Sequence, residues 1–445
     1  MSQWHRCEPN DAALSGQTVD YVETDGADLM GRWSDFQRYW DNRLAADVDP
    51  FARVMTSRVG PEASVMTRAN ERLRGVNFAS HDYLSLASHS DVCAAAIEAI
   101  GRWGLHSGGS VSLQGGSVPL MALEQHLAET WKCREATVFP TGWSACYGVI
   151  KALVRDADHV LLDGRVNGGL REGAFNATSN VHVLSDFAPE AIEDLLVRIR
   201  RRSGQAGILV VTEALSQVDS TVPDLRMLQE VCHSFEATLL VDVSHDFGAI
   251  GPGGTGFLGQ QGMLRQVDLV VGSLSETFAS NGGFVASSAI GIKQAMRTIL
   301  GPMMFTSALT PVQASVIDAA LSVARSPEGA KRRRILMRNA KRLREGLAAC
   351  AFRVWGEPSP IVPVWAGPTD RARLITGAVL RAGALVNLTE YPVVPIGASR
   401  WRLQVMSAHT PAQIDRVVAI VAAARREVGP MPRLLQVHDG QGSGG

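Results

Sequence analysis

The stretches LLVDVSHDFGAIGPGGTG (residues 239–256) and VDLVVGSLSETFASNGGF (residues 267–284) decide the fold. Each begins with a run of apolar, β-favouring residues and ends in a polar, glycine-rich segment. Continuous apolar runs of this length are typical of strands that are buried on both faces of a parallel sheet. Ligands of such sheets bind beyond the carboxyl ends of the strands, so the polar residues that follow each run are candidate site residues.

Similar apolar runs occur earlier in the chain, with helical patterns between them. These runs are ATVFP (136–140), HVLLD (159–163) and GILVVTE (207–213). One intervening stretch, PLMALEQHLAETWK (119–132), carries its apolar residues on one helical face. Strands that alternate with amphipathic helices predict an α/β domain with a mostly parallel sheet over residues 76–310.

The remaining segments have other patterns. Residues 1–75 are polar, with helical spacing of their apolar residues, and we expect a helical lead-in. Residues 311–435 combine a long basic helix with short strands, which predicts a smaller C-terminal α+β domain. Residues 436–445 are rich in glycine, and we expect a disordered tail.

Composition excludes several classes of protein. The chain has 445 residues and a formal net charge of −1, which gives no global attraction to nucleic acid, and we expect no nucleic-acid partner. No apolar run approaches the roughly 18 residues of a membrane span, and the polar first residues lack the apolar stretch of a signal peptide. We therefore expect a cytoplasmic protein. The six cysteines show no ligand spacing, so neither a disulfide framework nor a metal site is predicted.

Polar residues follow the predicted strands at several places. Asp242 and His245 lie three residues apart after one strand, and Ser273 follows the next. Gly142 and Trp143, in PTGW, open a helix after an earlier strand, an arrangement that suits an anion. A histidine in a cavity can titrate near neutrality, which favours His245 as a functional residue. Each feature alone is weak, because such residues are more often structural.

The order and spacing of these segments resemble those of the α-oxoamine synthases, the family of serine palmitoyltransferase, aminolevulinate synthase and aminooxononanoate synthase. The resemblance covers about residues 76–425. The matching blocks are NFASHDYLSLASH (77–89), HSGGSVSLQGGSVPLMALE (106–124), VFPTGW (138–143), VVTEALSQVD (210–219), LLVDVSHDFGAIGPGGTG (239–256), GSLSETFASNGGF (272–284), FTSALTP (305–311) and SRWRLQVMSAHT (399–410). It implies a fold-type I architecture, as in pyridoxal-phosphate (PLP) transferases, and a dimer with its sites at the interface.

The resemblance also implies roles for individual residues. Asp242 matches the partner of the pyridine nitrogen of PLP, and His245 matches the partner of its phenolic oxygen. Arg400 matches the arginine that holds the substrate carboxylate, although Arg402 lies on the same strand face and could take its place. Residues that match phosphate contacts are Gly142, Trp143 and Ser273, with Thr306 and Ser307 reaching the phosphate from the neighbouring subunit.

The departures from the family pattern concern the same pocket. Glu276 stands at the position of the Schiff-base lysine, Asn167 at that of the histidine that stacks on the cofactor, and His81 at that of an asparagine. An arginine of the family is Val111 here. The chain has lysine only at positions 132, 151, 293, 331 and 341, none beside this motif. The sequence therefore predicts either that PLP binds without a covalent link or that there is no cofactor.

Two functions remain open on these observations. The first is an acyltransferase that joins an acyl thioester, of CoA or of a carrier protein, to an amino-acid-like or amine acceptor in a biosynthetic pathway. Its catalytic residues would be Asp242 with His245 or Glu276 as general base. The second is an inactive subunit that pairs with a lysine-bearing homologue. A homodimer favours the first and a heterodimer the second. Glu276 could also simply occupy the space of the lost lysine.

Overall fold

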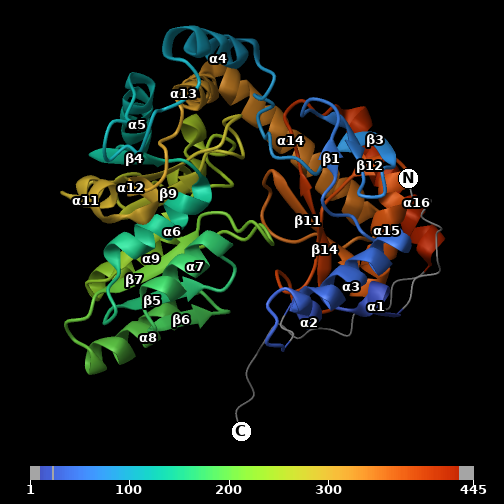
Figure 1. Ribbon diagram of the computed structural model, residues 1–445, viewed down its shortest axis with the longest axis horizontal. Coiled ribbons are helices and arrows are strands. Elements are labelled where there is room, and N and C mark those ends of the chain that lie inside the picture. The colour runs from blue at the N-terminus through green and yellow to red at the C-terminus, as the bar shows by residue number, and fades with distance from the viewer. Residues whose placement is uncertain (1–10, 23–24, 430–445) are drawn as a thin grey trace.

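The computed structural model of the chain describes residues 11–22 and 25–429. It forms two lobes (Figure 1). One lobe holds the large central sheet, and the other brings the N-terminal and C-terminal parts of the chain together. Helices α13 (Pro311–Arg325) and α14 (Pro327–Ala349) lead from the first lobe to the second.

The central sheet has seven strands and is mostly parallel, as the sequence predicted. The strand order is β4 (Glu135–Phe139), β10 (Gly283–Ser287), β9 (Leu269–Ser273), β8 (Thr238–Asp242), β7 (Ile208–Glu213), β5 (His159–Asp163) and β6 (Val181–Leu184). Strands β5, β6, β7, β8 and β9 all run in the same direction. Strand β10 runs antiparallel to both of its neighbours, β9 and β4. Consequently β4 points the same way as β9, and their carboxyl ends share one edge.

Helices cover both faces of this sheet, because successive side chains of each buried strand point to opposite faces. On one face Leu239 and Val241 belong to one apolar cluster, and on the other Leu240 belongs to a second. The helices of the first face are α5 (Val118–Trp131), α8 (Pro189–Arg202), α9 (Leu225–Ser234) and α13. Those of the second face are α6 (Gly142–Leu153), α7 (Gly168–Ala177), α11 (Ile292–Ile299) and α12 (Gly301–Met304). The remaining elements of this lobe are α4 (Ser90–Trp103), η2 (Pro252–Gly254) and α10 (Gly256–Gln260).

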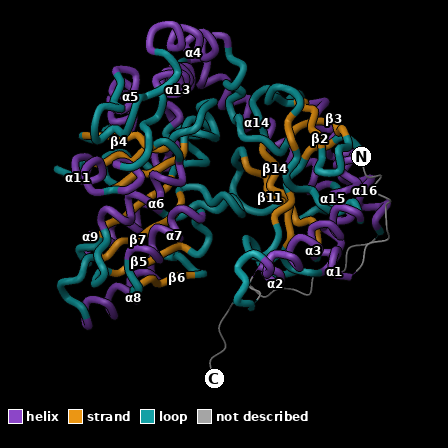
Figure 2. Tube along the Cα trace, in the orientation of Figure 1, coloured by secondary structure: helices purple, strands orange, loops and turns teal. Residues whose placement is uncertain are grey.

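The second lobe contains two small sheets, visible as a separate group of strands in Figure 2. The first has the order β1 (Val54–Met55), β2 (Glu62–Met66), β3 (Arg72–Asn77), β12 (Ala384–Leu385), and the second β11 (Ile361–Gly367), β14 (Ser399–Gln404), β13 (Leu388–Thr389). The helices of this lobe are α1 (Asp11–Ser15), α2 (Val19–Val22), η1 (Gly31–Trp33), α3 (Ser34–Ala45), α15 (Thr369–Arg381) and α16 (Pro411–Val428).

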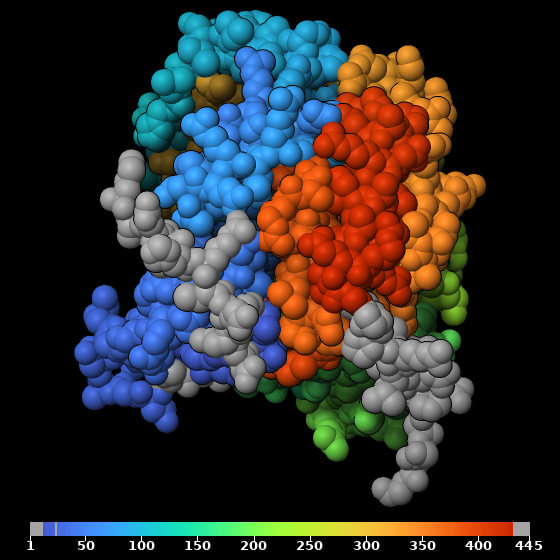
Figure 3. Space-filling view, turned by 90° about the vertical axis from the view of Figure 1, so that its right-hand side faces the viewer, coloured from blue at the N-terminus to red at the C-terminus, as the bar shows by residue number. Residues whose placement is uncertain are grey.

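The expected division at residue 76 therefore differs from the structure. Residue 76 lies within β3, which pairs in parallel with β12, so the N-terminal segment and the C-terminal domain form one lobe. Figure 3 shows the two segments side by side. Buried Arg43 and Arg373 both bind the Glu390 carboxylate, at 3.2 and 2.6 Å. Val76 and Ala384 in the paired strands, and Arg43 and Glu390 in the ion pair, are each more than 300 residues apart in the sequence, so sequence spacing does not reveal these contacts. Residues 436–445 lie outside the described residues.

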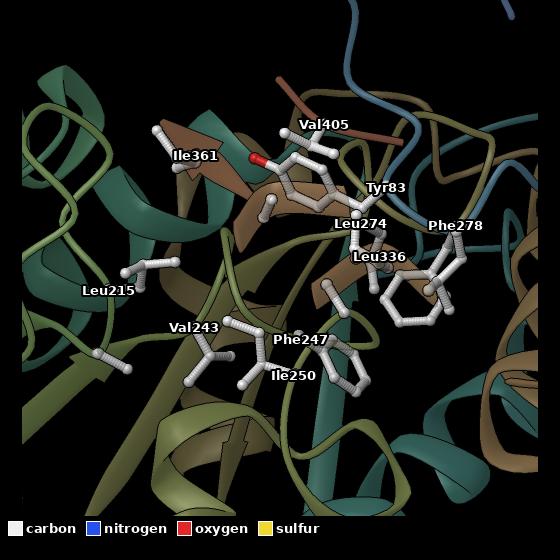
Figure 4. Close-up of a cluster of buried hydrophobic side chains, with 14 of the residues drawn as sticks. Tyr83, Leu215, Val243, Phe247, Ile250, Leu274, Phe278, Leu336, Ile361 and Val405 are labelled. Carbon is white, nitrogen blue, oxygen red and sulfur yellow. The ribbon is translucent and has the colours of Figure 1, made fainter. Parts of the chain in front are cut away.

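One apolar cluster continues through both lobes (Figure 4). Val243, Phe247 and Leu274 come from the loops beside β8 and β9, whereas Tyr83 and Val405 come from the second lobe. All five are buried. The Tyr83 hydroxyl points away from the Phe278 ring in this view. This shared core holds the strand ends of the large sheet against the loop that carries Tyr83, and it thereby positions the candidate site.

Candidate active site

The candidate site lies at the carboxyl edge of the central sheet, where β5 and β6 point toward the second lobe (Figure 1). From the sheet lobe come residues that end a strand or open the following helix. These are Gly142, Asn167, Glu213, Asp242 and Ser273. From the second lobe come residues of the loop after β3 and of β14. These are His81, Tyr83, Arg402 and Gln404. The strand-end residues that the sequence singled out thus lie at a single edge.

Asp242 is buried and fully hydrogen-bonded. Its Oδ1 accepts hydrogen bonds from the backbone N (2.8 Å) and the Oγ (2.6 Å) of Ser244. Its Oδ2 accepts one from Asn167 Nδ2 at 2.5 Å and lies 3.5 Å from Cys146 Sγ. Burial raises the pKa of the Asp242 carboxyl, and the bonds from Ser244 oppose this rise.

A second buried carboxyl supports the same region. Glu213 accepts hydrogen bonds from the backbone N of Asn167 (2.8 Å) and of Gln217 (2.9 Å). Burial and the neighbouring Asp242 carboxyl raise the pKa of Glu213 well above its ordinary value. Glu213 therefore favours its neutral form, and it fixes the backbone from which the Asn167 side chain reaches Asp242.

His245 is linked to the second lobe through Tyr83. The Tyr83 hydroxyl lies 3.2 Å from His245 Nδ1 and donates to Gln404 Oε1 at 3.0 Å. Burial, together with nearby Arg402 and His81, lowers the pKa of His245 well below its ordinary value. The structure therefore differs from the expectation that His245 titrates near neutrality, because the imidazole is out of water and beside a cation. These effects favour the neutral imidazole of His245.

Of the two arginines on β14, Arg402 contacts the site residues. Its Nη2 lies 3.2 Å from His81 Nε2, and its Nη1 donates to Gln217 Oε1 at 3.1 Å. Burial and the Arg402 charge lower the pKa of His81 to about 3. Arg400, which the sequence pattern favoured as the carboxylate-binding residue, lies with its guanidinium 4.3 Å from the Trp355 ring centre. The structure thus brings Arg402, and not Arg400, to His81.

Glu276, which the resemblance places at the position of the Schiff-base lysine, lies in the loop after β9. Its backbone O accepts a hydrogen bond from the Tyr83 backbone N at 3.2 Å, and its carboxylate is hydrogen-bonded by Ser273. Its Oε2 is buried without a hydrogen-bond partner. Burial and nearby Asp242 raise the pKa of Glu276 to about 7, against the opposing effects of Ser273 and Arg402. At neutral pH this carboxyl is divided between its two protonation states.

The start of α6 forms a close contact with the end of β9. A Cβ placed on Gly142 would lie 2.5 Å from Ser273 Cβ, so only glycine fits this crossing. The Thr141 and Ser144 side chains form a capping box, which leaves the first-turn amides of Gly142 and Trp143 without an intrahelical acceptor. These amides suit an anion. The Trp143 side chain is half exposed and stacks on Tyr147.

Thr306 and Ser307 lie apart from this cluster. Both are exposed and follow α12, next to Phe305, which is 85% exposed. The structure does not bring them to the site of their own chain.

Several residues of the site were not predicted from the sequence. They are Tyr83, Glu213, Ser244 and Gln404. The structure also places the Cys146 thiol at Asp242, at the edge of the apolar cluster to which Cys146 belongs. Tyr83, Glu213, Ser244 and Gln404 all lie within the matching blocks. Nothing in the sequence distinguishes them from their neighbours in those blocks.

Neither a metal site nor a membrane span is visible in the described ranges. Residues 11–22 and 25–429 contain no group of three or more His, Cys, Asp or Glu side chains that could hold a metal ion. No helix of the same ranges is long and apolar enough to cross a membrane.

Comparison with known proteins gives matches over most of the chain. The model of the aminotransferase class I and II family matches residues 74–421. Serine palmitoyltransferase of Sphingomonas paucimobilis is 32% identical over 383 residues, which cover 86% of this chain and 89% of that protein. The 8-amino-7-oxononanoate synthase of Stutzerimonas stutzeri is 32% identical over 370 residues, covering 83% and 91% respectively.

Solved structures agree with these matches. A Lys→Ala variant of the Sphingomonas paucimobilis enzyme, with a bound PLP–myriocin aldimine, matches with a TM-score of 0.84 and 29% identity. The match covers 90% of this chain and 99% of that one. Serine palmitoyltransferase of Sphingomonas wittichii also gives a TM-score of 0.84, with 26% identity over 91% of this chain and all of that one.

Proposed function

The chain belongs to the aminotransferase class I and II family and, within it, to the α-oxoamine synthases, and we propose that it is an acyltransferase of that type that acts without a lysine–PLP Schiff base. The donor is an acyl thioester of CoA or of a carrier protein, and the acceptor is an amino acid or a related amine. The observation that carries the proposal is Glu276, a buried titratable carboxyl at the position that the resemblance assigns to the lysine, in a site that keeps Asp242 and His245.

The residues present fit PLP held without a covalent bond to the protein. The first-turn amides of α6 suit its phosphate. Gly142 packs so closely against Ser273 that no side chain fits between the start of α6 and the end of β9. Asp242 offers a buried carboxylate to a ring nitrogen, and His245 offers a neutral imidazole to a phenolic oxygen. When bound, PLP supplies an electron sink for a carbanion next to the amino nitrogen. The Lys→Ala variant of the palmitoyltransferase, with its bound PLP–myriocin aldimine, supports this fit.

Each protein group has a distinct task in this proposal. Glu276 accepts and returns a proton near neutral pH, where its pKa of about 7 makes both directions accessible. Neutral His245 positions the ligand through Nε2, because its Nδ1 faces the Tyr83 hydroxyl. Arg402, whose guanidinium has three donors beyond those directed at His81 and Gln217, binds a carboxylate.

The first experiment is a PLP titration of the purified protein, followed by absorbance and then by borohydride reduction with mass analysis. We expect saturable binding without a reducible adduct on the protein. A reducible adduct on any lysine of the wild-type chain would contradict the proposal. Acyl transfer is then measured as thiol release from a panel of acyl-CoA thioesters in the presence of amino acids, with Glu276→Gln as the inactive control.

A second function is favoured by the position of Thr306 and Ser307. These residues are exposed beyond α12 and could reach a site in a neighbouring subunit. In this role the chain is an inactive partner of a lysine-bearing homologue. Size measurement of the chain alone and after co-expression with such a homologue separates the two functions. A stable homodimer with acyl transfer favours the enzyme. A heterodimer whose activity depends on Thr306, and not on Glu276, favours the partner.

A further inference from the structure

A short chain of hydrogen bonds links His245 to the second lobe, and each of its members is buried. The Tyr83 hydroxyl lies 3.2 Å from His245 Nδ1 and 3.0 Å from Gln404 Oε1. The exposed fraction is 0% for Tyr83 and Gln404 and 8% for His245. Because water has little access to these contacts, the protons on the three side chains must account for both of them.

The backbone holds the Tyr83 hydroxyl in this place. The Tyr83 N donates to the Glu276 O at 3.2 Å, and the Tyr83 O accepts from the Ser407 N at 2.8 Å. Gln404 is the last residue of β14, where it pairs with Ile361 of β11. Figure 4 shows the Tyr83 hydroxyl directed to the side on which Ile361 lies. The three side chains are therefore held by the fold in one arrangement.

The Tyr83 hydroxyl has a single proton for two neighbours. Burial raises the pKa of Tyr83, which keeps this proton, and lowers the pKa of His245, which leaves one proton on the imidazole. Gln404 Oε1 can only accept, so the hydroxyl donates to it. The hydroxyl oxygen then accepts from His245, which requires a proton on Nδ1. If the hydroxyl donated to Nδ1 instead, Oε1 would be buried without a hydrogen bond, at a cost in free energy.

The orientation of the Gln404 amide decides between these two arrangements. Oε1 faces the Tyr83 hydroxyl, and Nε2 is buried without a hydrogen-bond partner in the part of the chain that the structure describes. An amide turned over would place Nε2 at the hydroxyl, and the hydroxyl proton would then be free to go to His245 Nδ1. Gln404 thus acts on the imidazole without touching it.

The other nitrogen of His245 is left for a ligand. Among the described residues, Tyr83 is the side-chain hydrogen-bond partner of His245, and its contact is at Nδ1. The centre of the His81 ring lies 5.8 Å from that of His245, and its Nε2 faces Arg402 Nη2 at 3.2 Å. An arginine nitrogen can only donate, so His81 is occupied with Arg402 and does not compete for His245.

We propose that Gln404 is a positioning residue which, through Tyr83, holds His245 in the tautomer that carries its proton on Nδ1. His245 Nε2 then has no proton, and it accepts a hydrogen bond from a ligand. This inference rests on the proposed function, because His245 meets the ligand of the same site. It gives the site a preference for a ligand that presents a neutral hydroxyl to His245 over one that presents an oxyanion.

The tautomer is measured by NMR of PLP-free protein with isotope-labelled histidine, in which the His245 signals are identified by their loss in His245→Asn. We expect the proton on Nδ1 in the wild type. Gln404→Leu removes the acceptor, so the Tyr83 hydroxyl should donate to Nδ1 and the imidazole proton should move to Nε2. Gln229→Leu is the matched control, because Gln229 is a buried glutamine of the sheet lobe that donates to Asp268 at 2.9 Å. It should leave the tautomer unchanged.

A double-mutant cycle tests whether Gln404 acts through Tyr83. In Tyr83→Phe the hydroxyl is absent, so the further change Gln404→Leu should not alter the tautomer. Thermal unfolding checks that each variant folds, and Gln404→Met replaces Gln404→Leu if the latter does not fold. A proton on Nε2 in the wild type, or an unchanged tautomer in Gln404→Leu, would overturn the inference. An effect of Gln404→Leu that persists in Tyr83→Phe would contradict the role of the hydroxyl.

A ligand without an aldehyde reports on the same nitrogen. 4′-Deoxypyridoxine 5′-phosphate keeps the phenol of PLP but forms no Schiff base, and its absorbance distinguishes phenol from phenolate. We expect the phenol when it binds the wild type and a shift toward the phenolate in Gln404→Leu. Bound phenolate in the wild type would contradict an accepting Nε2.

The relay and the proposed function can fail separately, because the tautomer is measured without ligand and without acyl transfer. A proton on His245 Nδ1 in a protein that neither binds the probe nor transfers an acyl group would retain the relay and contradict the proposed function. Acyl transfer by a protein with the proton on Nε2 would do the reverse.

Discussion

Asn167 Nδ2 lies 2.5 Å from Asp242 Oδ2, so a side-chain amide directly contacts the carboxylate that the family resemblance assigns to a ring nitrogen. The resemblance places a stacking histidine at position 167. Where the resemblance assigns a ring that covers a ligand, this chain has an amide that binds Asp242. A ligand nitrogen that approaches Oδ2 competes with Asn167 for the same oxygen.

Asn167→His should strengthen PLP binding, by about tenfold. The change removes the competing amide from Asp242 and supplies a ring for stacking. Asn167 Oδ1 also caps α7 through Leu170 N at 3.1 Å, so the variant should lose about 1 kcal/mol of stability. Asn167→Ser, which keeps a capping hydroxyl without a ring, is the matched control. Weaker PLP binding in Asn167→His, measured by absorbance titration, would show that the amide assists the ligand.

Glu276→Lys should restore a covalent link to PLP. The residue follows β9, at the position that the resemblance assigns to the lysine, and its buried carboxyl end shows that the side chain reaches the interior. An amine there is beside neutral His245 and Tyr83, whose surroundings disfavour an additional charge and so favour a neutral, nucleophilic lysine. Borohydride reduction followed by peptide mass analysis should find the adduct at position 276. A reduced adduct at Lys293 or Lys151 instead would place PLP outside this site.

The sequence allowed much of the sheet and half of the site to be predicted. The strand-end residues converge because carboxyl ends of parallel strands share an edge, so position after a strand was sufficient to group Asp242, His245 and Ser273. Tyr83 and Arg402 come from the other lobe, and only the packing of two lobes brings them to the same place. Strand alternation could not separate Arg400 from Arg402, because both have the same parity on β14.

Two further features depended on contacts that are remote in sequence. Strand β10 begins at Gly283, near the end of the 272–284 block. The residue pattern of β10 itself indicates neither its antiparallel direction nor its place between β9 and β4. The pairing of β3 with β12 joins Val76 to Ala384. No local propensity predicts such pairings, which are chosen by the packing of the whole lobe.

Glu390→Gln should destabilise the second lobe by about 3 kcal/mol or more. Glu390 binds both Arg43 and Arg373, and all three side chains are buried, so the variant leaves two buried cations without their anion. Asp415→Asn is the control, because its pair with Arg342 is exposed and should contribute little. Urea unfolding with a probe in α3 measures the effect. Equal midpoints for the two variants would show that the buried cluster does not stabilise the docked N-terminal segment.

Glu276→Gln should change the pH dependence of stability. The folded protein has a pKa of about 7 at Glu276, above the ordinary value of 4.5. Below pH 4.5 the carboxyl is protonated in both the folded and the unfolded protein, so it has no cost. Between pH 4.5 and 7 the carboxyl is ionised in the unfolded protein and still protonated in the folded one, so the free energy of unfolding falls over this range by about 3 kcal/mol and is level above it. The charges that face this group are Asp242, which raises its pKa, and Arg402, which lowers it, with neutral Tyr83 between the lobes.

The glutamine variant should accordingly match the wild type near pH 4.5 and exceed it in melting temperature at pH 8 and above. Asp246→Asn is the matched control, because burial raises the pKa of Asp246 to about 8 and its Oδ2 accepts a hydrogen bond from the Phe257 backbone N. That variant should also gain stability at alkaline pH. If Glu276→Gln showed no gain at pH 8, the carboxyl would be paired or solvated in solution, and it would lose the raised pKa on which its proposed proton-transfer role depends.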